Sequence, residues 1–358
     1  MPFMKKLTLV LIALSLFITS QNVVLARSGL FSEKEEIRWG QSAAETTIKG
    51  KGLSEDQTLQ ERATNTLNRL LPNVKRKNLP YQVRVIKDKA INAFTYPGGQ
   101  IFVTEALMRQ AATNDELAFV IGHEIGHTEN YHIVNAVERS LLTGLLTYTL
   151  FRNDQDLGSI VGTVVQVSMS RGYGFKNEHQ ADYAGFRLAT QAGYNPAGGA
   201  VFFHELQEKY GDGSQSIANF VSPHPKNSVR IDNQLAYLKD FSGKRITIEL
   251  PKTKEQKAAA IYIDNQLALT IQAAHDNWSA VQRAEWVAGR LSALLHHDQN
   301  LIPDGFSLKT NENGDTVIYY NETNAIVTIW PEDATEVDTN VQTIGMNWIH
   351  SLVASLQK

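Results

Sequence analysis

The chain has no cysteine among its 358 residues. This absence excludes a disulfide framework, a thiol nucleophile and a lipid-modified cysteine behind a leader peptide. A strong basic excess is also missing, because the formal net charge is −3, and no basic surface for nucleic acid is expected. No repeat of fixed period is visible in the sequence, so a helical-repeat array is excluded as well.

Long apolar runs are scarce. The run from Leu7 to Ile18 is twelve residues long, which is short for a membrane span. Lys5 and Lys6 precede it, and the small residues near Ala26 suit a cleavage site, so residues 1–26 are predicted to be a signal peptide. An uncleaved anchor is the alternative. An exported chain without cysteine indicates the bacterial periplasm.

Two further apolar stretches run from Ser140 to Phe151 and from Leu157 to Met169. Each has about a dozen residues, which favours core helices over membrane spans. A membrane-facing surface stays open as the alternative.

The sequence does contain a His-Glu-x-x-His motif, His123 to His127, inside an apolar run. Thr113 and Glu116 stand in capping-box spacing ahead of it and predict the start of a helix. On a helix the two histidines lie one turn apart on one face, where each can give a nitrogen to zinc. Glu124 would sit at the open side of the metal and take a proton from water. The motif therefore predicts metal-assisted hydrolysis. The alternative, a pair of surface histidines, is disfavoured by the apolar flanks.

A second acidic segment supplies the remaining groups of such a site. Glu178 lies 51 residues after His127, far enough to come from a separate helix packed against the first. Asp182, one turn further along, is suited to accept a hydrogen bond from a ligating histidine and so fix its tautomer. His123, His127 and Glu178 are the predicted ligands of one zinc ion per chain.

These motifs resemble the zinc metallopeptidase family that includes the CAAX prenyl protease and the HtpX-like bacterial proteases. The resemblance covers roughly residues 30–240, and its segments follow the order of the family. Gln180 departs from the pattern, because the family commonly has a second glutamate there. The segments are Asn92-Ala93-Phe94 with Pro97-Gly98-Gly99-Gln100-Ile101, His123 to His127, Ser170-Arg171-Gly172-Tyr173-Gly174 with Glu178 and Asp182, and Ser222-Pro223-His224-Pro225 with Arg230.

The resemblance implies further roles for residues outside the ligand set. An edge strand beside the zinc helix would hold an extended peptide through its backbone, with Asn92 and Ala93 as the contacts. Ordinary strand residues are the alternative there. His224 would lie near the metal, where it could stabilise an oxyanion or occlude the zinc. Arg230 would anchor that loop or pair with Asp182. A turn histidine and a surface arginine are the alternatives.

The predicted fold class is α+β. A mostly helical, zincin-like metallopeptidase domain with a small edge-strand sheet is expected over residues 27–243, followed by a small α+β domain over 244–358 of unassigned role. Within the second domain, a long alanine-rich helical stretch is expected from Pro251. Strands at 316–320 and 325–330 and a last helix at 341–356 should follow it.

Three functions fit these features. The first is an exported zinc endopeptidase acting on unfolded or misfolded envelope proteins, the quality-control role that the resemblance implies. The second is a gated, chaperone-like zinc protein with little proteolysis, although a pure binder would not need Glu124. The third is a non-peptide zinc hydrolase, which the edge-strand hairpin disfavours.

Overall fold

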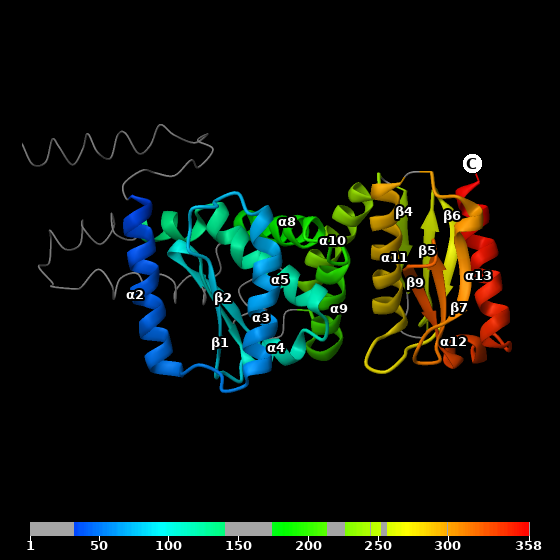
Figure 1. Ribbon diagram of the computed structural model, residues 1–358, viewed down its shortest axis with the longest axis horizontal. Coiled ribbons are helices and arrows are strands. Elements are labelled where there is room, and N and C mark those ends of the chain that lie inside the picture. The colour runs from blue at the N-terminus through cyan, green and yellow to red at the C-terminus, as the bar shows by residue number, and fades with distance from the viewer. Residues whose placement is uncertain are drawn as a thin grey trace, which may run out of the picture.

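The computed structural model describes residues 32–139, 174–212, 226–243, 245–251, 256–298 and 300–357. The predicted signal peptide, the two apolar stretches at 140–151 and 157–169, and His224 lie outside these residues. Figure 1 shows two lobes side by side, the first running from α2 to α10 and the second from β4 to α13. The predicted α+β class is confirmed. Within the described ranges, every helix is too short or too polar to cross a membrane.

The first lobe is mostly helical, and its strands form one small sheet. Its elements are α2 (Glu33–Lys51), α3 (Gln57–Leu70), η1 (Leu71–Asn73), β1 (Gln82–Ile86), β2 (Ala93–Tyr96), η2 (Pro97–Gly99), β3 (Gln100–Thr104), α4 (Glu105–Gln110), α5 (Asn114–Glu129), α8 (Phe175–Gln191), α9 (Gly198–Tyr210) and α10 (Asn227–Phe241). A further helical segment, 132–139, follows α5.

Helix α2 is fastened to the end of the central helix α5 through one arginine. Arg76 donates to both carboxylate oxygens of Glu36 at 2.9 and 2.7 Å, and to the carbonyl of Thr128 at 3.0 Å. Glu36 is 1% exposed, so this ion pair is buried. Gly52, with a φ of 78°, ends α2 and separates it from α3, because a positive φ stops a helix at little cost only in glycine.

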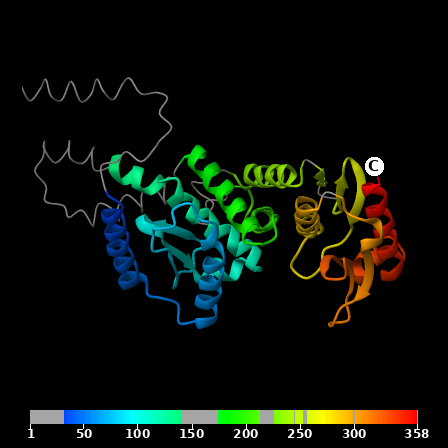
Figure 2. The same ribbon diagram turned by 45° about the horizontal axis from the view of Figure 1, so that its top comes forward.

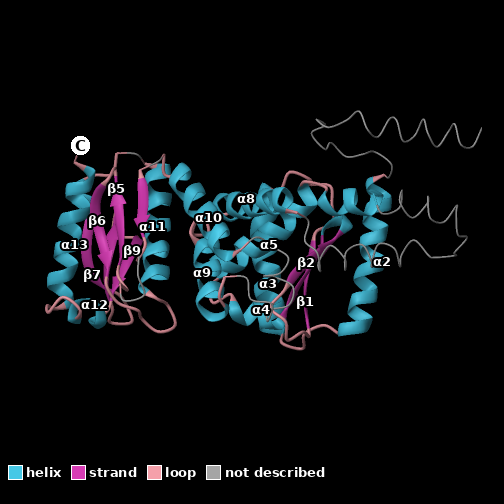
Figure 3. Cartoon of the chain, turned by 180° about the vertical axis from the view of Figure 1, so that it is seen from behind, coloured by secondary structure: helices cyan, strands magenta, loops and turns pink. Residues whose placement is uncertain are grey.

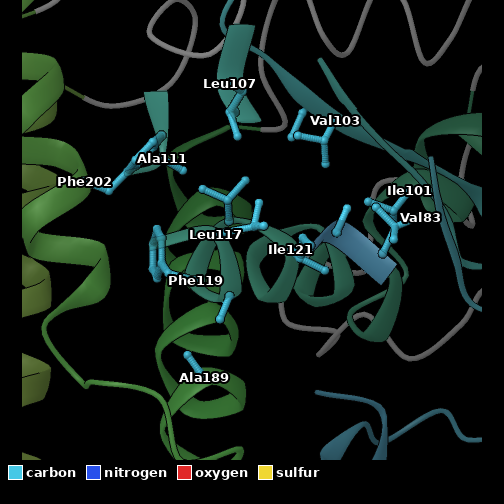
Figure 4. Packing of buried hydrophobic residues seen from close by; sticks show 14 of the residues in the cluster. Val83, Ile101, Val103, Leu107, Ala111, Leu117, Phe119, Ile121, Ala189 and Phe202 are labelled. Atoms are coloured by element: carbon cyan, nitrogen blue, oxygen red, sulfur yellow. The ribbon is translucent and has the colours of Figure 1, made fainter. Parts of the chain in front are cut away.

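The sheet of the first lobe has the order β1-β3-β2, with β1 parallel and β2 antiparallel to β3. The predicted hairpin is thus present, and β2 lies at one edge of the sheet. Figure 4 shows the core between the sheet and α5, where side chains from β1, β3, α4 and α5 meet. This core fixes α5 in the middle of the lobe, with 14 of its 16 residues buried.

The second lobe is a layered α+β unit. Figure 3 shows its strands between α11 on one side and α13 on the other. Two three-stranded antiparallel sheets, β4-β5-β6 and β7-β8-β9, share one apolar core with these helices. Its elements are β4 (Ile246–Glu249), β5 (Ala259–Ile263), β6 (Gln266–Ile271), α11 (Ala280–His297), η3 (Pro303–Gly305), β7 (Phe306–Thr310), β8 (Thr316–Tyr320), β9 (Asn324–Ile329), α12 (Pro331–Thr335) and α13 (Val341–Leu356).

The prediction of a helix that begins at Pro251 is wrong for the residues before Ala280. Residues 259–271 form the β5–β6 hairpin, and a helix begins only at Ala280. The hairpin turns at Asp264 and Asn265, whose φ angles of 51° and 65° match a type I′ turn. The alternating burial of β5 confirms a strand period, which the alanines concealed. The predicted strands at 316–320 and 325–330 and the last helix are present.

The two lobes meet where α9 and α10 pack against α11, as the turned view in Figure 2 also shows. His204 and Glu285 face each other across this junction, 2.6 Å apart, and the Asn195 side chain donates to the carbonyl of Trp286 at 3.0 Å. Burial lowers the pKa of His204, but nearby carboxylates, chiefly Glu285, raise it above its usual value. Leu238, on α10, belongs to the core of the second lobe. The domain division at residues 243 and 244 stays a prediction.

Candidate metal centre

Helix α5 begins at the predicted cap. The Thr113 hydroxyl accepts the backbone N–H of Glu116 at 3.3 Å, and the Glu116 carboxylate accepts the N–H of Ala112 at 2.8 Å. His123 and His127 then fall one turn apart on the buried helix, 0% and 1% exposed. Their ring nitrogens are thereby removed from water and held by the helix.

Helices α5 and α8 approach closely because glycines line their contact. A methyl group on Gly126 would lie 2.7 Å from the Ala184 side chain, and one on Gly185 would lie 2.8 Å from the carbonyl of Phe119. Real side chains do not tolerate such distances, so only glycine permits this spacing. The close approach brings the first two turns of α8 against the two histidines.

His123, His127 and Glu178 form a cluster with the geometry of a metal site. The Nε2 atoms of the two histidines are 3.1 Å apart, and the Glu178 oxygens lie 3.6 Å from His123 Nε2 and 3.8 Å from His127 Nε2. Ligands around one tetrahedral zinc stand about 3.3–3.5 Å apart, given bonds of about 2.0–2.2 Å. The residues therefore fit a zinc ion. This is the one such cluster found in the part of the chain that the structure describes.

The His123 ring is oriented by a buried ion pair. Its Nδ1 donates to Asp182 Oδ1 at 2.9 Å, which leaves the Nε2 lone pair directed toward Glu178 and His127. Arg230 donates to both oxygens of Asp182, with an Nε–Oδ2 distance of 2.9 Å, and lies over the Phe203 ring. Burial raises the pKa of Asp182, but Arg230 and His123 lower it by more. The structure thus brings both predicted supporting residues to the cluster.

His127 is oriented by a second pair, which the sequence analysis missed. Its Nδ1 lies 3.0 Å from His132 Nδ1, and His132 Nε2 lies 3.0 Å from Gln180 Oε1. The amide oxygen can only accept, so His132 carries its proton on Nε2 and accepts from His127 at Nδ1. With its proton on Nδ1, His127 presents the lone pair of Nε2 to the metal. Gln180, which departs from the family pattern, therefore acts through His132.

One signal could have revealed His132. It follows the motif by five residues and the end of α5 by three, where a turn can fold it back. Tyr131 supplies that turn with a φ of 57°, a value that few residues other than glycine adopt. Burial lowers the pKa of His132 to about 4, which keeps the ring neutral and able to accept a hydrogen bond.

Glu124 is buried beside the cluster, with 4% of its surface exposed. Burial raises its pKa to about 8, and the nearby Glu178 charge adds to the rise, while Arg230 opposes it. The positive charge of a bound metal would lower the value again. A carboxyl group so placed can change its protonation state near neutral pH.

The predicted roles of Asn92, Ala93 and His224 remain predictions. Asn92 and Ala93 are 5% and 7% exposed at the edge of the sheet. The backbone of Asn92 bonds to Thr104, so in the alternating pattern of an antiparallel pair the backbone of Ala93 points away from β3, toward the edge of the sheet. Their role in substrate binding stays a prediction. His224 lies outside the described residues.

We expect His132→Phe to weaken zinc binding by about 10–100-fold, the usual effect of removing a group that orients a ligating histidine. Phenylalanine keeps the ring volume but cannot accept the proton of His127. Competition with a metal-sensitive dye would measure the affinity. His179→Phe is the matched control, because His179 contacts Tyr237 at an exposed position on α8. Equal affinities in the two variants would contradict the orienting role.

Comparison with known proteins agrees with this geometry. Over 154 residues the chain is 28% identical to the mitochondrial metalloendopeptidase OMA1 of Arabidopsis thaliana, covering 43% of this chain and 31% of that protein. It is 28% identical over 160 residues to the beta-barrel assembly-enhancing protease of Yersinia pestis, covering 40% and 32%. With the metalloprotease LoiP of Escherichia coli K12 it shares 29% over 174 residues, covering 48% and 67%. The chain thus spans about a third of the length of the first two relatives.

Two family models match successive parts of the chain. A domain of unknown function, DUF8459, matches residues 260–358, the greater part of the second lobe. The model of peptidase family M48 matches residues 57–237, half of the chain, and this span includes the three clustered ligands. The ligand geometry and this match together confirm zinc as the cofactor, and the chain belongs to peptidase family M48.

Proposed function

We propose that the protein is an exported zinc endopeptidase that hydrolyses peptide bonds in unfolded or misfolded proteins of the bacterial envelope. The observation that carries this proposal is the joint burial of Glu124 and the ligand cluster on α5 and α8. A general base beside a three-ligand metal site is the arrangement that metal-assisted hydrolysis needs. The relatives described as metalloendopeptidases and proteases support the same reaction class.

The residues would divide the chemistry among them. Zinc, held by His123, His127 and Glu178, supplies Lewis-acid chemistry that acidifies water and polarises the carbonyl of the scissile bond. Glu124 accepts the proton from the attacking water and later delivers it to the leaving amine. Asp182, held by Arg230, keeps the imidazole of His123 in the tautomer that presents Nε2.

The substrate is expected to bind in extended form along β2, where Ala93 presents its backbone. Pairing with an edge strand recognises the main chain of a peptide and depends little on its side chains. Such recognition suits unfolded segments, whose backbone groups are not already bonded in helices or sheets. The relative described as beta-barrel assembly-enhancing protease supports a role in the quality control of envelope proteins.

Export to the periplasm forms part of the proposal. It rests on the predicted signal peptide over residues 1–26 and on the absence of cysteine. Fractionation of cells, combined with N-terminal sequencing of the mature chain, would test it. A mature chain that begins near Arg27 in the periplasmic fraction supports the proposal. A chain that keeps its leader in the membrane fraction would favour the anchored alternative.

A second function, a gated and chaperone-like zinc protein, is favoured by one observation. His123, Glu124, His127 and Glu178 are each at most 4% exposed, so a substrate needs movement of the surrounding chain to reach them. His224, as a further metal ligand, is our candidate for the gate. Activity that appears only in His224→Ala would identify a gated protease.

Removal of zinc should abolish cleavage. We expect the mature chain to digest an unfolded protein such as reduced, alkylated lysozyme, to stop after dialysis against a chelator, and to recover when one equivalent of zinc is added. The physical reason is that Glu124 alone cannot make water nucleophilic enough at neutral pH. Gel electrophoresis follows the cleavage, and the folded form of the same protein serves as the control substrate. Unchanged cleavage by the zinc-free chain would exclude the proposed mechanism.

A further inference from the structure

A cavity of about 360 Å³ lies in the second lobe beside the junction with the peptidase lobe. Its volume falls within the range of about 300–1,000 Å³ that is typical of ligand pockets. Trp278, Trp286 and Trp330 line it, and Ala112, just ahead of the zinc helix α5, contributes to its wall. The other two tryptophans of the chain, Trp39 and Trp348, are buried in the cores. Three of the five tryptophans therefore surround one cavity, where each stays partly exposed.

The aromatic walls are built to keep their shape. The His275 ring stacks on Trp330 with centroids 3.7 Å apart, and Trp278 packs edge-on against Trp286 at 5.0 Å. The backbones of His275 and Trp278 exchange two hydrogen bonds of 3.0 Å, so a closed loop presents Trp278. A preformed aromatic surface of this kind binds a flat apolar group at a small cost in conformational entropy.

The cavity is also lined by an arginine that forms no direct ion pair among the described residues, although the charge of Asp115 acts on it from a greater distance. Arg283 forms a two-pronged ion pair with Asp333 at 2.8 and 2.6 Å, so its charge is balanced. Arg290 instead donates to the carbonyl of Ile326 at 3.3 Å and lies 5.5 Å from the Trp286 ring. Among the described residues, no carboxylate forms an ion pair with Arg290. Burial lowers the pKa of Arg290, although Asp115 opposes the shift, so an anion bound here would relieve a desolvated charge.

We propose that this cavity binds a polypeptide segment that carries an aromatic side chain next to a carboxylate. The aromatic ring would lie against the tryptophans, and the carboxylate would bind the guanidinium of Arg290. This assignment concerns the peptide substrates of the proposed endopeptidase and therefore rests on that function.

The position of the cavity favours a peptide over a small aromatic acid. His123 lies about 14 Å along α5 from Asn114, at 1.5 Å per residue. An extended peptide rises about 3.3 Å per residue, so four or five residues span that length. Helix α5 is buried, so a substrate must pass around it and needs more residues than this minimum. An unfolded chain has that length and a small aromatic acid does not, and binding at both places would hold the substrate at two points.

The test measures binding and does not depend on cleavage. Calorimetric titration uses the full mature chain with Glu124→Gln and a ten-residue Gly/Ser peptide that contains one Phe-Glu pair. Matched peptides replace the Phe with Ala or the Glu with Gln. The protein variants are Arg290→Gln and Trp278→Leu. Lys309→Gln is the control, since it removes an exposed positive charge from β7 of the same lobe.

We expect each change to the peptide, Arg290→Gln and Trp278→Leu to weaken binding by about 10–100-fold, and Lys309→Gln to leave it unchanged. The losses from Arg290→Gln and from the Glu-to-Gln peptide should not add, because both remove one ion pair. Equal binding by Arg290→Gln and the Lys309 control would overturn the proposal. So would N-acetylphenylalanine binding as tightly as the peptide. Normal peptide binding by the Glu124→Gln chain, together with a wild-type chain that holds zinc and never cleaves an unfolded protein, would disprove the proposed peptidase and leave this site standing.

Discussion

Glu124→Gln is expected to lower the rate of peptide hydrolysis by about 10²–10⁴-fold, the usual contribution of a general base. Glutamine has the same shape, but it cannot accept the proton of the attacking water. The zinc content should stay at one ion per chain, because the ligands on α5 and α8 are untouched. Cleavage of an unfolded protein, measured beside the zinc content of both chains, gives the result.

The matched control for this variant lies on the same helix. Glu116 is buried at the start of α5, and its pKa is raised to about 8 by burial and by the nearby Glu205 charge. The carboxyl is therefore largely protonated near neutral pH, and Glu116→Gln should preserve both cap and activity. A Glu124→Gln chain that holds zinc and still cleaves at the rate of the control would remove Glu124 from the mechanism.

Arg230→Met should destabilise the folded chain by about 3–5 kcal/mol, the cost of leaving one member of a buried ion pair alone. Asp182 is 1% exposed and would keep a charge that only the His123 ring could then offset. Methionine fills much of the space over the Phe203 ring, so the loss reports mainly the charge. Urea unfolding of the zinc-free chain would measure the difference in the free energy of unfolding.

An exposed lysine, Lys309, provides the reference for this experiment. Lys309 pairs with Glu322 at the surface, where water screens the interaction, and Lys309→Met should change stability little. If Arg230→Met unfolds at the same urea concentration as this control, the buried pair does not support the site as described.

The metal centre was predictable because its signals are local. One helical turn separates the two ligating histidines, and a second turn separates Glu178 from Asp182, so spacing alone places each pair on one face. The sequence also favours the packing of α5 against α8, because glycines and alanines lie at their contact. Sequence spacing could show that Glu178 comes from another helix, and the structure adds how closely that helix approaches.

The features that were missed depend on how distant segments meet. His132 reaches the site because Tyr131 turns the chain back, and a positive φ at tyrosine has no clear sequence signal. The alanines of the β5–β6 hairpin suit a helix as well as a strand, so composition alone predicts a helix there, and the turn at Asp264 and Asn265 that separates the two strands is not considered in that prediction. The aromatic cavity collects residues from a loop, a helix and a strand end, which no period in the sequence relates.

Helix α10 packs into both lobes and therefore couples the unfolding of one lobe to that of the other. Near its start Arg230 holds Asp182, while near its end Leu238 is buried in the core of the second lobe. Phe241, its last residue, stacks on His296 of α11 with ring centroids 3.9 Å apart. Opening the second lobe therefore removes packing from the helix that supports the metal site. Unfolding should therefore be cooperative across the junction between the lobes. A destabilising substitution in the core of the second lobe should also lower the affinity of the metal centre for zinc.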